Sequence, residues 1–442
     1  MQTRFSETAL RDPATRASER ILRACVHCGF CTATCPTYLL LGDERDSPRG
    51  RIYLIKDMLE REKPASAAVV GHLDRCLSCL SCMTTCPSGV DYMHLIDHAR
   101  ASLEHTTRRP WADRLLRAAL ASILPYPKRF RAAAALGAWA RPLAPLMRAL
   151  PDFGAQFGAR MAALLALSRP PARAIREAVR VAAPQRGRVA ILEGCAQPAL
   201  APSINAAARR FLARCGVETI AAPDAGCCGA LVHHMGREDA ARAFARRNVD
   251  AWSRLIEDGG LDAIVVTTSG CGTTLKDYGR LLEHDPAYAA KAARIGALTK
   301  DISEYLATLD WTATTPRAIV LAYHAACSLQ HGQTVTTAPK TLLRKAGYRV
   351  REPAESHICC GSAGVYNILQ PALAGALRTR KLGHLERLKP DAIAAGNIGC
   401  LVQLAQGPAP VAHTIEWLDW ACGGPAPAGL SHSVLAPRAD GA

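Results

Sequence analysis

Apolar residues recur along this chain in two different rhythms, and the rhythm changes near residue 187. In "SPRGRIYLIKDMLEREK", Ile52, Ile55 and Leu59 are three and four positions apart. This spacing places them on one face and predicts a helix. Beyond residue 187, short β-rich runs alternate with helical stretches, which is typical of βαβ units and a parallel sheet.

The β-rich runs form two sets of three, because the second half of the chain is an internal repeat. The first set covers 188–193, 217–221 and 262–267, and the second covers 317–322, 348–350 and 391–395. Around them, "RVAILEGCAQPAL", "DAGCCGALVHH" and "DAIVVTTSGCG" of the first copy correspond to "RAIVLAYHAACSLQ", "SHICCGSAGVYN" and "DAIAAGNIGC" of the second. Cys195 precedes Cys227 by the same 32 positions that separate Cys327 from Cys359.

These patterns predict a multidomain chain with α and α/β parts. We expect a helical domain followed by two α/β repeats, since 442 residues suit about three domains. The expected segments are a helical domain over 1–105, a basic helical connector over 106–186, repeats over 187–310 and 311–422, and a disordered tail over 423–442.

The eighteen cysteines suggest thiols kept for metal rather than disulfides. Disulfide scaffolds are usually small and secreted, whereas residues 1–25 show no apolar core of signal-peptide length. In 112–168, Arg, Lys and Pro interrupt each apolar run before the roughly 18 residues that a membrane span needs. We therefore expect a cytoplasmic protein without a transmembrane segment, with a peripheral position at the inner face of the cell membrane as the alternative.

The formal charge of +16 would suit an anionic membrane surface, nucleic acid or an acidic partner, but it also fits a solvated basic face. A zinc-containing nucleic-acid-binding protein is one rival that the charge raises. We expect no nucleic-acid partner, because the cysteine spacing described next favours a different chemistry.

The first hundred residues contain the spacing C-x2-C-x2-C-x3-C-P twice. In this ferredoxin-type run, three closely spaced thiolates bind one [4Fe-4S] cluster and the fourth, before proline, reaches the other. A zinc ribbon would have no use for the third cysteine of each run or for the repeated Cys-Pro. The predicted ligand sets are Cys25, Cys28, Cys31 and Cys86 for one cluster, and Cys35, Cys76, Cys79 and Cys82 for the other.

Arginines and a histidine near these runs have two interpretations each. Arg49 and Arg51 would either raise the potential of a cluster through their charge or pair with the acidic residues at 43, 44 and 46. His27 is expected at the surface or behind the ligands rather than as a ligand.

Each copy of the repeat is expected to bring four thiols together, since each thiol follows a strand and the carboxyl ends of parallel strands meet at one edge. These groups are Cys195, Cys227, Cys228 and Cys271 in the first copy, and Cys327, Cys359, Cys360 and Cys400 in the second. Three interpretations stay open: an additional iron–sulfur centre, a redox dithiol pair, and buried apolar cysteines. Gly229 and Gly361 are expected to let backbone approach such a centre.

Other residues near the repeats are assigned more ordinary roles. Cys215 and Cys422 have no counterpart in the repeat and are expected to pack in the core. His233, His234 and His324 would either relay protons or tune a centre, or else form hydrogen bonds in loops.

At these residues the chain resembles the Cys-Cys-Gly repeat family and, more narrowly, the glycolate oxidase (glycolate dehydrogenase) iron–sulfur subunits. The resemblance rests on "ILRACVHCGFCTATCPTY", "SPRGRIYLIK", "HLDRCLSC", "LEGCAQP", "AGCCGA", "SGCG", "CCGSAG" and "NIGC", in this order. One departure concerns Thr268 and Asn397, which stand where full repeats of this family have the first cysteine of a C-x2-C. A five-cysteine centre is therefore in doubt here.

The resemblance implies an electron-transfer subunit of a flavoprotein 2-hydroxy-acid dehydrogenase complex. Flavin-binding partner subunits, which would carry the FAD and the substrate site, would oxidise glycolate to glyoxylate, with D-lactate as a further substrate. This chain would pass the electrons through two [4Fe-4S] clusters toward a quinone or another membrane acceptor of the respiratory chain. The connector 106–186 is expected to face the flavoproteins. The alternatives are a subunit of a lactate-utilisation or glycerol-3-phosphate dehydrogenase complex, or a disulfide or quinone reductase that uses the Cys-Cys-Gly centres itself.

Overall fold

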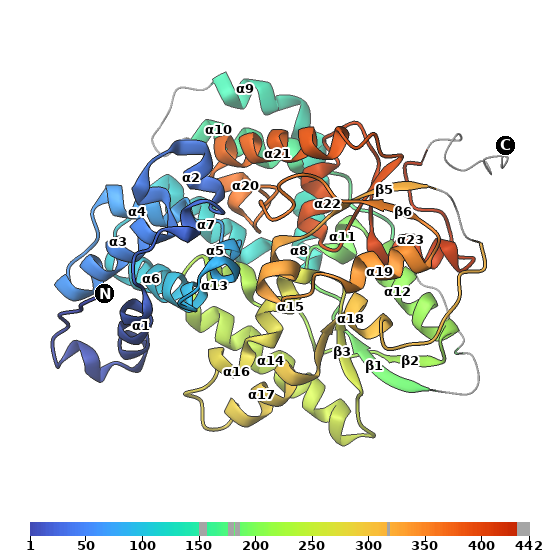
Figure 1. Ribbon diagram of the computed structural model, residues 1–442, viewed down its shortest axis with the longest axis horizontal. Coiled ribbons are helices and arrows are strands. Elements are labelled where there is room, and N and C mark those ends of the chain that lie inside the picture. Colours follow the sequence, from blue (N-terminus) through green and yellow to red (C-terminus); the bar gives the residue numbers. More distant parts are fainter. Residues whose placement is uncertain (150–156, 176–180, 182–185, 316–318, 431–442) are drawn as a thin grey trace.

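The computed structural model describes residues 1–149, 157–175, 181, 186–315 and 319–430 (Figure 1). Outside this range lie residues 317–318 of an expected strand, 150–156, 176–180 and 182–185 of the expected connector, and 431–442 of the expected tail. Within the described residues, no helix has both the length and the apolarity needed to cross a membrane.

The N-terminal region is built from short helices, as the sequence predicts. They are η1 (Ala9–Arg11), α1 (Pro13–Ala24), η2 (Phe30–Thr32), α2 (Pro36–Leu41), η3 (Glu44–Asp46), α3 (Pro48–Arg61), α4 (Ala67–Asp74), α5 (Ser81–Thr85) and α6 (Tyr92–Thr106). Helix α3 begins where the Ser47 hydroxyl accepts from the Gly50 amide, and Pro48 suits its first turn. Its predicted apolar face, with Ile52, Ile55 and Leu59, is buried against α1 and α6.

In the described part of 106–186, four α-helices and one short 3₁₀ turn form the connector. They are α7 (Trp111–Ile123), α8 (Pro127–Ala140), η4 (Arg141–Leu143), α9 (Ala144–Ala149) and α10 (Phe157–Leu167). Several large apolar side chains of these helices are exposed, among them Trp111, Leu136 and Trp139.

The two repeats each contain a four-stranded parallel sheet. The first has β1 (Gly187–Ile191), β2 (Val217–Ile220), β3 (Ala263–Val266) and β4 (Thr299–Asp301) in the order β2-β1-β3-β4. The second has β5 (Val320–His324), β6 (Arg349–Arg351), β7 (Ala392–Ala395) and β8 (Val411–His413) in the order β6-β5-β7-β8. The identical order confirms the internal repeat and the α/β character.

Helices connect and cover these strands. In the first repeat they are α11 (Gln197–Leu200), α12 (Ser203–Arg214), α13 (Ala230–His234), α14 (Glu238–Glu257), α15 (Ser269–Lys276), α16 (Tyr278–Leu281), α17 (Ala289–Leu298) and α18 (Ile302–Leu306). In the second they are the π-helical turn η5 (Ser328–Gly332), α19 (Ala338–Lys345), α20 (Tyr366–Leu369), α21 (Pro371–Glu386), α22 (Ile398–Leu404) and α23 (Thr414–Ala421).

The repeats share one apolar core, which holds them together as neighbours. Val189 of β1, Leu321 of β5 and Trp417 of α23 belong to the same buried cluster. Helix α23 of the second repeat also packs on α12 of the first. The N-terminal helices lie on one side of this pair, where α6 contacts α13, α5 contacts η5 and α2 contacts α21 (Figure 1).

Candidate functional site

A first hollow opens between η2 and the turn that follows α5. Its lining includes Cys25, Cys28, Cys31 and Cys86. Cys25 is the residue at which α1 ends, and Cys86 is where α5 ends, so both thiols stand at helix ends that face each other. Burial raises the pKa of the Cys31 thiol to about 11.

A second hollow is lined by the other four thiols of the two runs, those of Cys35, Cys76, Cys79 and Cys82. Cys35 is the N-cap of α2, and Pro36 opens that helix, which directs this cysteine away from the three before it. Cys82 borders both hollows. The structure thus brings together the two sets of four that the spacing predicts, and their role as cluster ligands stays a prediction.

Polar groups surround the sulfurs of the second hollow. The Thr37 hydroxyl lies 3.3 Å and the Arg51 guanidinium 3.9 Å from Cys35 Sγ. The Tyr92 hydroxyl donates to Cys76 Sγ at 3.7 Å. Hydrogen bonds and positive charge near the sulfurs are two means by which proteins tune cluster potentials.

Both arginines of "PRGR" form ion pairs with nearby acidic residues, which was one of the two interpretations of their role. Arg51 pairs with Asp46 at 3.2 Å in the interior, whereas Arg49 pairs with Glu44 at 2.8 Å near the surface. Arg51 also contacts Cys35 Sγ of the second hollow. This residue is therefore both paired with an acidic residue and close to a candidate cluster ligand.

The two hollows differ in their exposure. Cys28 is exposed, and its neighbours Val26 and Phe30 keep 68% and 61% of their surface accessible. Cys76, Cys79 and Cys82 are all buried. The first hollow is therefore the one near the molecular surface.

The second hollow borders the second repeat. Cys79 belongs to one apolar cluster with Ile358 and Cys359, and Cys327 packs against that cluster. Tyr366 Oη donates to the Arg75 carbonyl at 3.0 Å across the same boundary. Thiols from the two ends of the sequence thus meet in one buried region.

The four thiols of the first repeat converge as predicted. A series of sulfur hydrogen bonds joins Cys195, Cys227, Cys228 and Cys271 in that order. The bond to Cys227, together with burial, raises the pKa of Cys195 well above its ordinary value.

The thiols of the second repeat converge in the same order. Cys327 lies 3.7 Å from Cys359, and Cys360 lies 3.6 Å from Cys400. Cys359 and Cys360 also contact each other. The geometry agrees with a metal centre, a dithiol pair or buried thiols, so the three interpretations still stand at this point.

The glycine after each Cys-Cys pair packs closely against a helix. Gly229 and Gly361 have φ angles of +87° and +88°, which favour glycine. A Cβ on Gly361 would lie 2.7 Å from the Ala374 carbonyl oxygen, and one on Gly229 would lie 3.2 Å from that of Ala241. These glycines therefore admit the backbone of α14 and of α21. Their own amides lie 3.4 Å from Cys227 Sγ and Cys359 Sγ, and the approach of this backbone to a bound centre stays a prediction.

Two of the candidate histidines bind a carboxylate. His233 and His234 each lie 3.3 Å from the buried Asp97 of α6. Burial alone would raise the pKa of Asp97, but the two imidazoles outweigh it and hold this pKa well below its ordinary value. These histidines tie α13 to the N-terminal helices.

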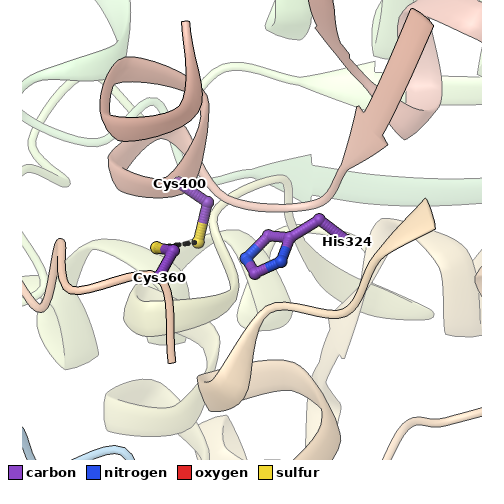
Figure 2. Close-up of side chains that lie close together, drawn as sticks. All are labelled: His324, Cys360 and Cys400. Atoms are coloured by element: carbon purple, nitrogen blue, oxygen red, sulfur yellow. Dashed lines mark hydrogen bonds between the residues drawn. The ribbon is translucent and has the colours of Figure 1, made fainter. Parts of the chain in front are cut away.

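His324, by contrast, points at sulfur. Its ring and the thiols of Cys360 and Cys400 offer ligand atoms that all lie within 4.8 Å of one another (Figure 2). Burial, with the nearby Lys381 charge, lowers the pKa of His324 to about 3, so the ring is neutral. The sequence placed His324 close to Cys327 only, since nothing in the pattern indicates which thiols a residue at the end of β5 will face.

Cys215 and Cys422 pack against the core that the repeats share, as expected. The segment "GCGTTL", residues 270–275, lies within α15, where Cys271 joins the first thiol group and Leu275 is buried. It is therefore part of the cysteine site.

Comparisons with known proteins agree with this layout. The family described as "4Fe-4S dicluster domain" matches residues 24–90, and "Cysteine-rich domain" matches 189–276 and 321–405. The crystal structure of a hypothetical protein from Helicobacter pylori has a TM-score of 0.53 and 12% identity, covers 93% of this chain and 73% of its own, and supports the fold alone.

Curated relatives match over most of the chain. The Escherichia coli K12 "Glycolate oxidase iron-sulfur subunit" is 43% identical over 95% of this chain and 99% of its own. The Bacillus subtilis 168 "Probable glycolate oxidase iron-sulfur subunit" is 30% identical over 89% and 90%. "Lactate utilization protein A" of Bacillus licheniformis is 25% identical over 49% and 90%. On this similarity, the chain belongs to the family of glycolate oxidase iron–sulfur subunits.

Proposed function

We propose that this chain is the electron-transfer subunit of a flavoprotein complex that oxidises glycolate to glyoxylate. Eight thiols divided between two hollows are the observation that carries the proposal. The close relatives named for glycolate oxidase support the choice of substrate.

The residues around each hollow fit a [4Fe-4S] cluster. At least four thiols line each space, with Cys82 shared between them, and thiolates are the usual ligands of such clusters. When bound, the clusters would supply one-electron transfer between a flavin and an acceptor. Cys25, Cys28, Cys31 and Cys86 would hold the first, and Cys35, Cys76, Cys79 and Cys82 the second.

The difference in exposure suggests which cluster receives electrons first. The face around Cys28, with Val26 and Phe30 exposed, would meet the flavin-binding partner. The apolar surroundings of the second hollow would exclude water from that site and keep it next to the second repeat. A quinone or another membrane acceptor would receive the electrons.

A lactate-oxidising complex is the second candidate. The relatives named for lactate utilisation support it, although their identity to this chain is lower. Steady-state oxidation of the two acids by the assembled complex separates these candidates.

Substitution of one ligand tests the proposal. In a complex of this chain with its flavin-binding partners, Cys79→Ser should leave the flavin reducible by glycolate and abolish onward transfer to a membrane acceptor. Cys215→Ser is the matched control, because this thiol packs against the shared core away from both hollows. Unchanged turnover of the Cys79 variant would refute an electron path through this site.

A further inference from the structure

We propose that the second repeat binds a single thiophilic divalent ion, zinc or ferrous iron, through His324, Cys360 and Cys400. The three donors come from different elements of one repeat: His324 ends β5, Cys360 follows β6, and Cys400 lies in α22. Figure 2 shows the imidazole directed at the two sulfurs. This inference is independent of the proposed role in glycolate oxidation.

The sulfur spacing suits one ion. Bonds of about 2.3 Å around a tetrahedral zinc place two thiolate sulfurs about 3.8 Å apart. Cys360 and Cys400 lie 3.6 Å apart, close to that edge. Thiolates on different irons of a cube stand farther apart, so this pair fits a mononuclear centre better than a further cube.

The histidine supplies independent evidence for a missing ligand. His324 is 1% exposed, and neither Nδ1 nor Nε2 has a hydrogen-bond partner in the structure. A buried polar group normally finds a partner, because leaving it unsatisfied costs about 1–3 kcal/mol. Imidazole and thiolate are ligands that zinc and iron share. A metal bound by one ring nitrogen would account for this orphaned side chain.

Neighbouring groups complete the environment. Asn397 Nδ2 donates to Cys400 Sγ at 3.6 Å, and such outer contacts orient metal ligands. Cys359 contacts Cys360, so a further sulfur donor stands beside the centre. The departure from the C-x2-C pattern at Asn397 thus has a structural role, because the amide supports a ligand instead of being one.

The first repeat lacks the two basic side chains that mark this site. Leu192 precedes Cys195 by three positions, as His324 precedes Cys327. Gly229 packs against Ala241 of α14, and Gly361 packs against Ala374 of α21. We align α14 with α21 by matching these two contacts.

On this alignment Asn248 of α14 corresponds to Lys381 of α21. Asn248 donates to the Cys227 carbonyl and to Tyr278 Oη, within a neutral network. Lys381 is 1% exposed and donates to the Glu355 carbonyl at 2.6 Å, so an amino group stands in the second repeat where the first has a neutral amide. We therefore expect the ion in the second repeat and no ion in the first.

The test compares metal with sulfide in the full chain. A [4Fe-4S] cluster has equal iron and acid-labile sulfide, so iron plus zinc should exceed sulfide by about one per chain. His324→Leu, which copies the first repeat, should remove this excess and leave the paramagnetic signals of the two clusters unchanged. The matched control is Cys271→Ser, which should keep the excess.

A second readout covers the case in which the variant does not fold. The mononuclear ion is first removed from the full-length protein, and cobalt is then added. A tetrahedral thiolate site should give cobalt absorption bands in the red part of the visible spectrum. No excess of metal and no cobalt bands would overturn the proposal, as would an excess that the folded His324 variant retains. Additional iron matched by equal sulfide in the second repeat would also overturn it, because a cluster would then occupy the site.

Discussion

The guanidinium of Arg51 lies 3.2 Å from the carboxylate of Asp46, and each of these side chains is only 1% exposed. Arg51 also donates to the His72 carbonyl and to Thr37 Oγ1. This pair joins α3 to the segment before it, directly beside the second hollow.

Arg51→Leu should destabilise the protein strongly. Its removal takes one of two arginines from the buried Asp46, whose pair with Arg75 at 3.0 Å remains. We therefore expect a loss of about 3 kcal/mol, the lower end of the range for breaking a buried pair. Arg49→Leu is the matched control from the same turn, since its exposed pair with Glu44 is worth at most about 1 kcal/mol. Urea unfolding of both variants gives the free energies, and equal losses would contradict the assigned difference in burial.

His94 should make the contact between α6 and the first repeat depend on pH. Its Nε2 lies 3.0 Å from Asp277 and its Nδ1 2.5 Å from Asp91. Burial lowers the pKa of His94, but these carboxylates outweigh it and raise the pKa to about 10. The stabilisation is thus complete below the unfolded pKa of about 6.5 and is lost as pH rises through the folded value.

His94→Gln should therefore cost on the order of 1–3 kcal/mol at about pH 6 and progressively less toward pH ~10. The measurement is the free energy of unfolding as a function of pH for wild type and variant. His105→Gln, at an exposed position of the same helix, serves as the control. Parallel pH curves for wild type and the His94 variant would show that this histidine is not the titrating link.

Phe30→Asp should slow electron transfer from the reduced flavoprotein. Phe30 is 61% exposed next to the first hollow, and the loss of an interface contact of this kind is worth more than about 1 kcal/mol, or roughly a tenfold weaker association. Stopped-flow mixing with the reduced partner measures it, with cluster content as the check on integrity.

The connector offers the competing surface for the same experiment. Trp139 on α8 is 83% exposed and lies in the segment that the sequence favoured as the docking face. Trp139→Asp should leave the rate unchanged. If this variant slows transfer and the Phe30 variant does not, the partner docks on the connector instead.

Regular patterns predicted the main elements, but the shortest strands escaped them. The helix with Ile52, Ile55 and Leu59 has a clear period, and the central strands β1, β3, β5 and β7 are largely apolar runs. Strands β4 and β8 have only three residues each, and β4 reads Thr-Lys-Asp. These two strands form because they pair with the outer edges of β3 and β7, and their own sequences carry no strand pattern.

The sequence predicted which cysteines group together but not how distant groups pack against each other. Spacing alone divided the eight N-terminal cysteines into two sets, because close sulfurs converge over short loops. The approach of Cys79 to Cys359, or of His324 to Cys400, depends on how separate domains and strands pack. No local pattern contains that information.

The most direct measurement is the iron and acid-labile sulfide content of the anaerobically purified chain, followed by electron paramagnetic resonance after dithionite reduction. The account predicts about eight sulfides per chain, with about eight cluster irons, and the signals of two interacting [4Fe-4S] clusters. Zinc with little or no sulfide, or a colourless protein, would contradict the central claim that the two sets of four cysteines carry electrons.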